Sequence, residues 1–278
     1  RLVGSEMCIR DRIPVIGKAQ KGRMSQEAGY AIMGRIALFN QRWDEAITAY
    51  KNVVGKVQLF KSGDGTDYAA NYADLFKEQN ETAAEVLLSV HFKGPGLGEG
   101  SCFGVCWSAP MNAIEGSMNL CDDFYCIDGL PIDKSPLFKG SLVQGAHTKA
   151  NPDMGRYENR DPRMKYTIVC NEMKWPVDPV EIWEGGSNGL PLTNATTTGY
   201  YLRKYVNSSI SFEAGAPTTK AHHNWILFRY AEVLLNYAEA MVNAYDDIAF
   251  TNEKCGMSAL QAVNQVRGRD GVLSLIHI

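Results

Sequence analysis

The sequence lacks the long apolar runs of a membrane-spanning protein, because none approaches the roughly 20 residues that a helix needs to cross a bilayer. It also lacks an excess of basic residues, and its formal net charge is -3. Binding to a phosphate backbone requires a basic field, so we do not expect a nucleic acid partner. With 45% hydrophobic and 21% charged residues, the 278-residue chain is predicted to be globular and to bury a sizeable core.

Motifs of several enzyme classes are also missing. The sequence has no G-x-S-x-G elbow, and no Gly-Lys-Ser/Thr follows the glycine-rich stretch 94–100, which is therefore expected to be a connecting loop. The acidic pair Asp122 and Asp123 fits a solvated surface better than the facing carboxylates of a glycosidase. Adjacent His222 and His223 point in different directions, which favours a surface pair over a metal site. We predict no catalytic residue and no cofactor.

The cysteines do not have the spacing of a metal site. Apart from Cys8 they are Cys102, Cys106, Cys121, Cys126, Cys170 and Cys255. Their C-x3-C and C-x4-C spacings differ from the C-x2-C knuckles of structural zinc, and no loop has the acidic order of a calcium-binding EF-hand. No metal is predicted. The first four of these cysteines are the favoured place for disulfides, with buried free thiols as the open alternative.

Both ends of the chain differ in character from the rest. Residues 1–12 and 273–278 resemble translated sequencing-adapter strings and do not continue the periodicity beside them. We therefore expect the folded part to span 13–272 and to be a piece of a longer protein.

Residues 26–54 have the pattern of a helical hairpin. The first helix is expected to end near Phe39 and the second to begin near Trp43. Gly34 and Tyr50 fall at the small and aromatic positions of a tetratricopeptide repeat. Because a lone hairpin of this kind cannot bury its own apolar face, we expect it to pack on other helices of the protein.

The region 225–268 is predicted to form the C-terminal helices, the first of them long, amphipathic and beginning at Trp225. Its apolar stripe comprises Tyr230, Val233, Leu234, Tyr237, Ala238 and Met241. A polar stripe on the adjoining face comprises Arg229, Glu232, Asn236 and Glu239. The second helix is expected at 258–268, where Ser258 and Gln261 form an S-x-x-Q capping box.

Between these helical regions the sequence changes character. Residues 85–92 are predicted to form a strand, and 94–220 to form a long loop-rich excursion with short extended pieces at 166–170 and 200–206. The fold class is therefore predicted to be mainly α, with tetratricopeptide-like hairpins as the scaffold and a few short strands. Long loops on a rigid scaffold are where binding residues concentrate, so we expect the ligand on this side.

Aromatic residues of the loop-rich region are the candidate ligand contacts. Trp rings cover the C–H face of a sugar, while nearby Asn and Arg side chains bond its hydroxyls. The candidate ligand-binding residues are Trp107, Trp175, Trp183, Asn188 and Arg156. For each tryptophan, packing in the core is the alternative role.

Several segments, taken in order, resemble those of the SusD/RagB family. They are the hairpin at 26–54, the stretch 72–76, Asp128-Gly-Leu-Pro-Ile132, Asp161-Pro162-Arg163, Tyr201-Leu-Arg-Lys-Tyr205, and the segments 225–240 and 262–269. The chain departs from the family at Asp270, where alanine is frequent, and in its cysteine cluster.

The resemblance implies a non-enzymatic surface lipoprotein that binds oligosaccharide at the outer membrane of a Gram-negative bacterium. Such a protein acts as the lid of a SusC-like TonB-dependent transporter and encloses the glycan before uptake. Its lipid anchor would precede the sequence at hand. A peptide-binding lid is the nearest alternative, an intracellular helical-repeat scaffold comes from a different class, and a glycosidase is the weakest alternative.

Overall fold

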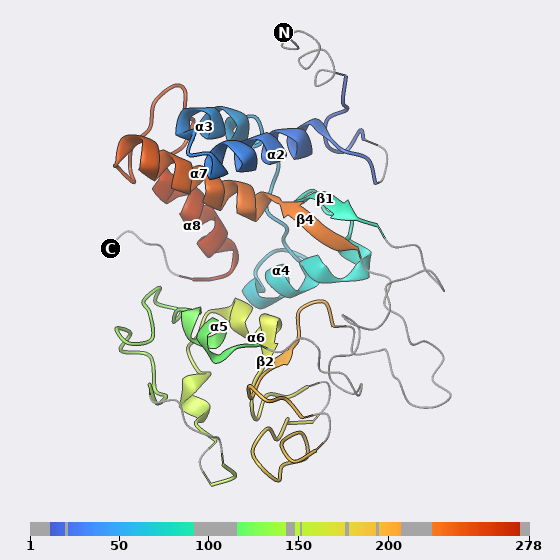
Figure 1. Cartoon of the computed structure of the whole chain (residues 1–278), viewed down its shortest axis with the longest axis vertical. Coiled ribbons are helices and arrows are strands. Elements are labelled where there is room, and N and C mark those ends of the chain that lie inside the picture. Colours follow the sequence, from blue (N-terminus) through green and yellow to red (C-terminus); the bar gives the residue numbers. More distant parts are fainter. Residues whose placement is uncertain are drawn as a thin grey trace.

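The computed structural model describes residues 12–19, 22–91, 116–142, 148–150, 152–175, 178–192, 195–206 and 224–272. Helices α2, α3, α7 and α8 gather at one end of the molecule, next to the paired strands β1 and β4 (Figure 1). The other end is built from α5, α6, β2 and many loops, with α4 between the two ends. The mainly helical class with few short strands, predicted from the sequence, is confirmed.

The N-terminal hairpin forms as predicted. Helix α2 spans Gln26–Phe39 and helix α3 spans Trp43–Lys51. The Ser25 hydroxyl caps α2 by accepting a hydrogen bond from the Ala28 amide at 3.2 Å. Gly34 lets the Tyr50 ring pack directly on the α2 backbone, since a Cβ at this position would lie only 2.5 Å from Tyr50 Cζ. The small and aromatic positions noted in the sequence are therefore in contact.

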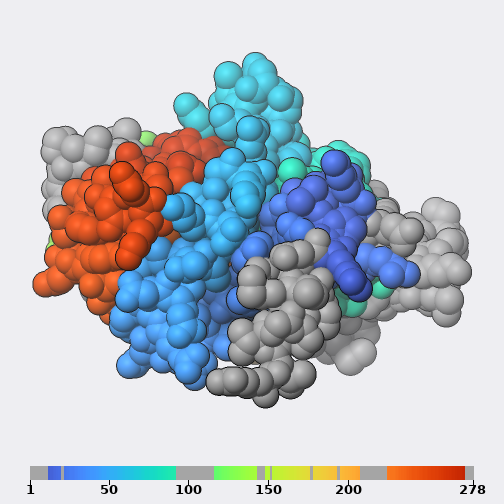
Figure 2. Space-filling model, turned by 90° about the horizontal axis from the view of Figure 1, so that it is seen from above, coloured from blue at the N-terminus to red at the C-terminus, as the bar shows by residue number. Residues whose placement is uncertain are grey.

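The C-terminal helices complete the core of this end. Helix α7 spans Tyr230–Tyr245, and every residue of its predicted apolar stripe is buried. Helix α8 spans Ala259–Arg269 and begins at the predicted capping box of Ser258 and Gln261. Figure 2 shows the blue N-terminal hairpin lying against the orange C-terminal segment, and α3 packs on α7 in one hydrophobic cluster. None of the helices in the described ranges is long and apolar enough to span a membrane.

The prediction that the long C-terminal helix begins at Trp225 was wrong, because the helix begins at Tyr230. Trp225–Arg229 is strand β4, which pairs antiparallel with β1, Val86–Val90. Trp, Ile and Phe suit a strand, and the backbone groups of this segment are satisfied by β1, so tertiary pairing overrides a helical pattern only a few residues long. Arg229 is therefore not part of the helical polar stripe. It has extended backbone before α7 and pairs with Glu85.

The chain between α3 and β4 contains further short elements, some before β1 and the others in the loop-rich excursion. They are α4 (Tyr68–Ala73), the 3₁₀ turns η1 (Asp74–Phe76), η2 (Glu78–Asn80) and η3 (Met154–Arg156), α5 (Met118–Asp123), α6 (Pro162–Thr167), β2 (Ile168–Val169) and β3 (Tyr201–Leu202). Strands β2 and β3 pair antiparallel, near the extended pieces expected from the sequence. The predicted glycine-rich loop at 94–100 lies outside the described residues, as do residues 1–11 and 273–278 of the two terminal stretches.

Four of the six cysteines of interest fall in the described part of the chain. Cys121, Cys126, Cys170 and Cys255 are all buried free thiols. Cys102 and Cys106 lie outside the described residues, so a disulfide between these two stays a prediction. For these four described cysteines, the sequence left disulfides and buried free thiols as alternatives, and the structure has buried free thiols.

Candidate ligand-binding pocket

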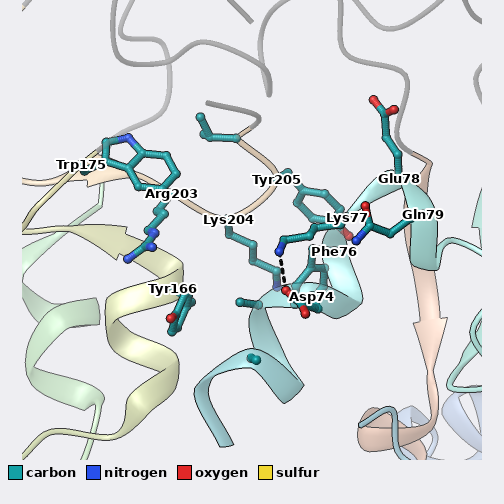
Figure 3. Close-up of a pocket in the computed structure, with 13 residues that line it drawn as sticks. Asp74, Phe76, Lys77, Glu78, Gln79, Tyr166, Trp175, Arg203, Lys204 and Tyr205 are labelled. Carbon is teal, nitrogen blue, oxygen red and sulfur yellow. Dashed lines mark ion pairs between the residues drawn. The ribbon is translucent and has the colours of Figure 1, made fainter. Parts of the chain in front are cut away.

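A pocket of about 750 Å³ opens between three segments that are far apart in the sequence (Figure 3). One wall comes from the end of α4 and the two 3₁₀ turns after it, another from α6 and the loop that ends at Trp175, and the third from the turn after β3. The lining residues are Ala70, Ala73, Asp74, Phe76, Lys77, Glu78, Gln79, Tyr166, Trp175, Arg203, Lys204, Tyr205 and Val206.

Arg203 lies against two aromatic rings on one side of this pocket. Its Cζ is 4.4 Å from the centroid of Tyr166 and 4.5 Å from that of Trp175, within the range of cation–π contacts (Figure 3). Its Nη1 donates a hydrogen bond to the carbonyl oxygen of Lys165 at 2.5 Å, which holds the side chain in place. Burial lowers the pKa of the Arg203 guanidinium, so its surroundings disfavour the charge. Trp175 beside this cation is half-buried.

The opposite wall is an aromatic platform that carries a second cation. Lys204 Nζ is 4.3 Å from the ring centroid of Phe76, and the Tyr205 ring meets Phe76 edge-on at 5.1 Å. Tyr205 in turn stacks on Trp225 of β4, again at 5.1 Å between centroids. Its φ of 66° lies in the left-handed region, where non-glycine residues are uncommon. The stacking and this turn together aim Lys204 and Tyr205 at the pocket.

The carboxylate of Asp74, on the rim of the pocket, is held by two neighbouring side chains. Asp74 accepts from Lys77 Nζ at 2.5 Å and from the Ser62 hydroxyl at 2.5 Å. Burial raises the pKa of Asp74, but the hydrogen bonds from Lys77 and Ser62 outweigh it, and the net shift is downward. Asp74 is therefore ionised at neutral pH, and Lys77 lies within ion-pair distance of it. Among the described residues, no group of three or more His, Cys, Asp or Glu side chains is placed to hold a metal ion.

The candidate residues from the sequence are spread over several places. Trp175 lines the pocket. Trp183 is only 8% exposed, and the Asn188 side chain accepts a hydrogen bond from the Glu181 amide at 3.1 Å. Arg156 is 3% exposed and pairs with Asp122 at 2.5 Å.

Trp107 lies outside the described residues. The structure therefore does not bring Trp183, Asn188 and Arg156 together with Trp175 at the pocket. Contact of any of the five with a ligand stays a prediction.

Several pocket residues were not among the candidates. They are Phe76, in the family-like segment 72–76, and Arg203, Lys204 and Tyr205, in the family-like segment 201–205 that was also predicted to be extended. The alternation of aromatic and basic residues in Tyr-Leu-Arg-Lys-Tyr was the available signal, because stacking surfaces and hydrogen-bond donors are the two components of a sugar site. No pattern in the neighbouring sequence indicated that residues 201–205 would face Trp175.

Comparisons with solved structures find the same fold. A SusD-like protein from Bacteroides fragilis NCTC 9343 matches with a TM-score of 0.69 and 23% identity, over 99% of this chain and 53% of that one. A SusD-like carbohydrate binding protein from the same organism matches with a TM-score of 0.69 and 22% identity, over 98% of this chain and 50% of that one. Surface glycan-binding protein A from Bacteroides uniformis matches with a TM-score of 0.52 and 16% identity, over 100% of this chain and 50% of that one.

The chain thus spans about half the length of these solved structures. A search of curated proteins finds no match. The profile described as the SusD family matches residues 57–275, which is most of the chain and includes all three walls of the pocket. The predicted resemblance is confirmed, and the chain belongs to the SusD family.

Proposed function

We propose that this protein binds oligosaccharide without catalysis, in the pocket bordered by Trp175, Phe76 and Tyr205. The observation that carries the proposal is the half-buried Trp175 on the wall of a cavity of about 750 Å³ that polar and charged side chains also line. An aromatic face for a sugar ring and donors for its hydroxyls are what sugar recognition requires. Two structural neighbours, a SusD-like carbohydrate binding protein and a surface glycan-binding protein, support the same class of ligand.

The cellular setting is part of the proposal. A SusD-family protein of this kind would sit on the outer-membrane surface through a lipid anchor and cover a SusC-like TonB-dependent transporter as a lid. It would hold the glycan until the lid closes over the barrel, so that binding and hinge motion replace chemistry. Co-purification of the full-length protein with the transporter encoded beside it tests this part, and a full-length protein that is never exported would overturn it.

The binding itself is tested by calorimetry of the full chain against a panel of soluble plant and algal polysaccharides. Trp175→Ala is expected to weaken binding of the best ligand about tenfold, since stacking of one ring contributes about 1 kcal/mol or more. Phe39→Ala is the matched control, because Phe39 is 82% exposed on α2 and is not a pocket residue.

Equal affinities of the Trp175→Ala and Phe39→Ala variants would rule out this pocket. Binding of a peptide mixture with no polysaccharide bound would favour the peptide-uptake alternative instead. Release of reducing ends from any bound polysaccharide would contradict the non-catalytic part of the proposal.

A further inference from the structure

The pocket contains two cations that are not matched by carboxylates. Within the described ranges, the ion pairs of the protein do not include Arg203 or Lys204. Both instead make cation–π contacts with the rings that line the cavity. A cation removed from water without a counter-charge is unfavourable, so an unmatched pair of cations at a pocket indicates a site for an anion.

Other inward-facing arginines show how this protein normally balances such a charge. Arg156 pairs with Asp122, and Arg269 pairs with Glu85 and Asp270. Arg160 is a different case, because it is buried and donates to the carbonyl oxygens of Phe124, Arg156 and Cys121. Its donors are occupied within the protein.

Arg203 differs from both cases. Among contacts with described residues, only its Nη1 donates, to the carbonyl of Lys165 and to the sulfur of Met173. None of its nitrogens is among the buried unsatisfied atoms of the described residues, so the remaining donors reach solvent in or beside the cavity. A guanidinium with free donors on a pocket wall is well suited to bind a carboxylate or sulfate through two parallel hydrogen bonds.

The acidic residues of the lining do not cancel this charge. Asp74 lies within ion-pair distance of Lys77, 2.5 Å away. Glu78 is exposed on the outer edge, where water screens its charge (Figure 3). Lys204 adds a second donor on the wall opposite Trp175, held over the Phe76 ring.

We infer that the pocket selects a glycan that bears an anionic group, a uronate carboxylate or a sulfate, which binds Arg203 and Lys204 while a sugar ring stacks on Trp175. This inference rests on the proposed glycan-binding function and adds the chemical class of the ligand. Stacking alone does not distinguish charged from neutral sugars, so the two cations supply the selectivity.

The test compares pairs of glycans that differ only in the charged group. One pair is oligogalacturonate and its methyl ester, and the other is a sulfated galactan oligosaccharide and its desulfated form. Calorimetry with the full chain is expected to give at least about tenfold tighter binding for one charged form, because charge-assisted hydrogen bonds are the stronger class. The pair that shows the difference identifies the anion as carboxylate or sulfate.

Two variants connect the selectivity to the pocket. Arg203→Gln and Lys204→Gln are each expected to weaken binding of the charged form more than binding of the neutral form, and so to reduce the preference for the charged form severalfold. If Arg203→Gln lowers the melting temperature because the bond to Lys165 is lost, Lys204→Gln still tests the site. Arg203→Lys, which keeps the charge but loses the planar fork, is expected to retain only part of the preference.

The outcomes separate the two proposals. Equal binding of charged and neutral forms would overturn the anionic selectivity and leave glycan binding intact. A preference that persists in both Gln variants would place the anion elsewhere and also overturn the inference. If the protein binds an acidic peptide but none of these four glycans and no other glycan, the proposed function itself is overturned.

Discussion

Glu85 and Arg269 form a fully buried ion pair that joins the residue just before strand β1 to the end of helix α8. Arg269 Nη1 lies 3.0 Å from one carboxylate oxygen of Glu85 and 2.9 Å from the other. The same carboxylate accepts from Arg229 Nη1 at 2.9 Å and from the Phe60 amide at 2.7 Å. Burial acts to lower the pKa of Arg269, but Glu85 and Asp270 raise it overall, so the arginine stays charged.

Replacement of this carboxylate is expected to be costly. Glu85→Gln removes the carboxylate that pairs with Arg229 and leaves buried Arg269 with Asp270 as its remaining counter-charge. The free energy of unfolding should fall by about 3–5 kcal/mol, measured by urea denaturation. Glu45→Gln is the control, because the Glu45–Arg42 pair is exposed at 64% and 65% and should change stability by less than about 1 kcal/mol. A Glu85→Gln loss no larger than that of the control would show that the pair does not hold the two ends together.

The close approach of α2 and α3 gives a second prediction. Gly34→Ala is expected to destabilise the protein by about 1–3 kcal/mol, because its Cβ would overlap the Tyr50 ring and force the helices apart. Gly29→Ala lies in the same helix with nothing within 4 Å of the new Cβ, so it should stabilise by about 0.5–1 kcal/mol. Thermal unfolding of both variants is the measurement. Shifts of the same sign would contradict this packing.

Alkaline pH should weaken the helical core through two buried tyrosines. Burial raises the pKa of Tyr50 and of Tyr237 to about 12 each, whereas an unfolded tyrosine ionises near pH 10. Between pH 10 and pH 12 the unfolded state binds fewer protons than the folded state. The contribution of the two protonated tyrosines to the free energy of unfolding is therefore fully present below about pH 10 and is lost as the pH rises towards about 12.

The measurement is urea denaturation at a series of alkaline pH values. Each of these tyrosines can contribute up to about 1.4 kcal/mol per pH unit, so Tyr50→Phe should make the decline visibly shallower. Among contacts with described residues, the phenylalanine variant loses the hydrogen bond that Asn236 donates to the Tyr50 hydroxyl at 3.1 Å. An unchanged slope would mean that Tyr50 ionises without opposing the fold.

Trp183 and Trp175 are predicted to respond in opposite ways to substitution. Trp183 is 8% exposed, so Trp183→Phe should lower the free energy of unfolding by about 1–3 kcal/mol and leave glycan affinity within about twofold. Trp175→Ala should do the reverse, with a small effect on stability and a large one on binding. Loss of binding in a folded Trp183→Phe variant would restore Trp183 as a ligand contact.

Local features of the fold followed from local sequence. The repeat of apolar residues at three and four positions predicted α2, α3 and the buried face of α7, and Ser258 with Gln261 predicted the start of α8. These features depend on residues within one or two helical turns of each other, so the sequence alone contains the necessary distances.

The pocket and the strand β4 were decided only by the tertiary structure. Trp225–Arg229 is extended because β1, more than a hundred residues earlier in the chain, offers its backbone for pairing. Likewise Phe76, Trp175 and Arg203 meet only when three separate segments are brought together. Sequence identifies which side chains can stack or carry charge, but their convergence depends on long-range packing, which no local periodicity encodes. The family and the scaffold were therefore predictable, and the position and charge of the site were not.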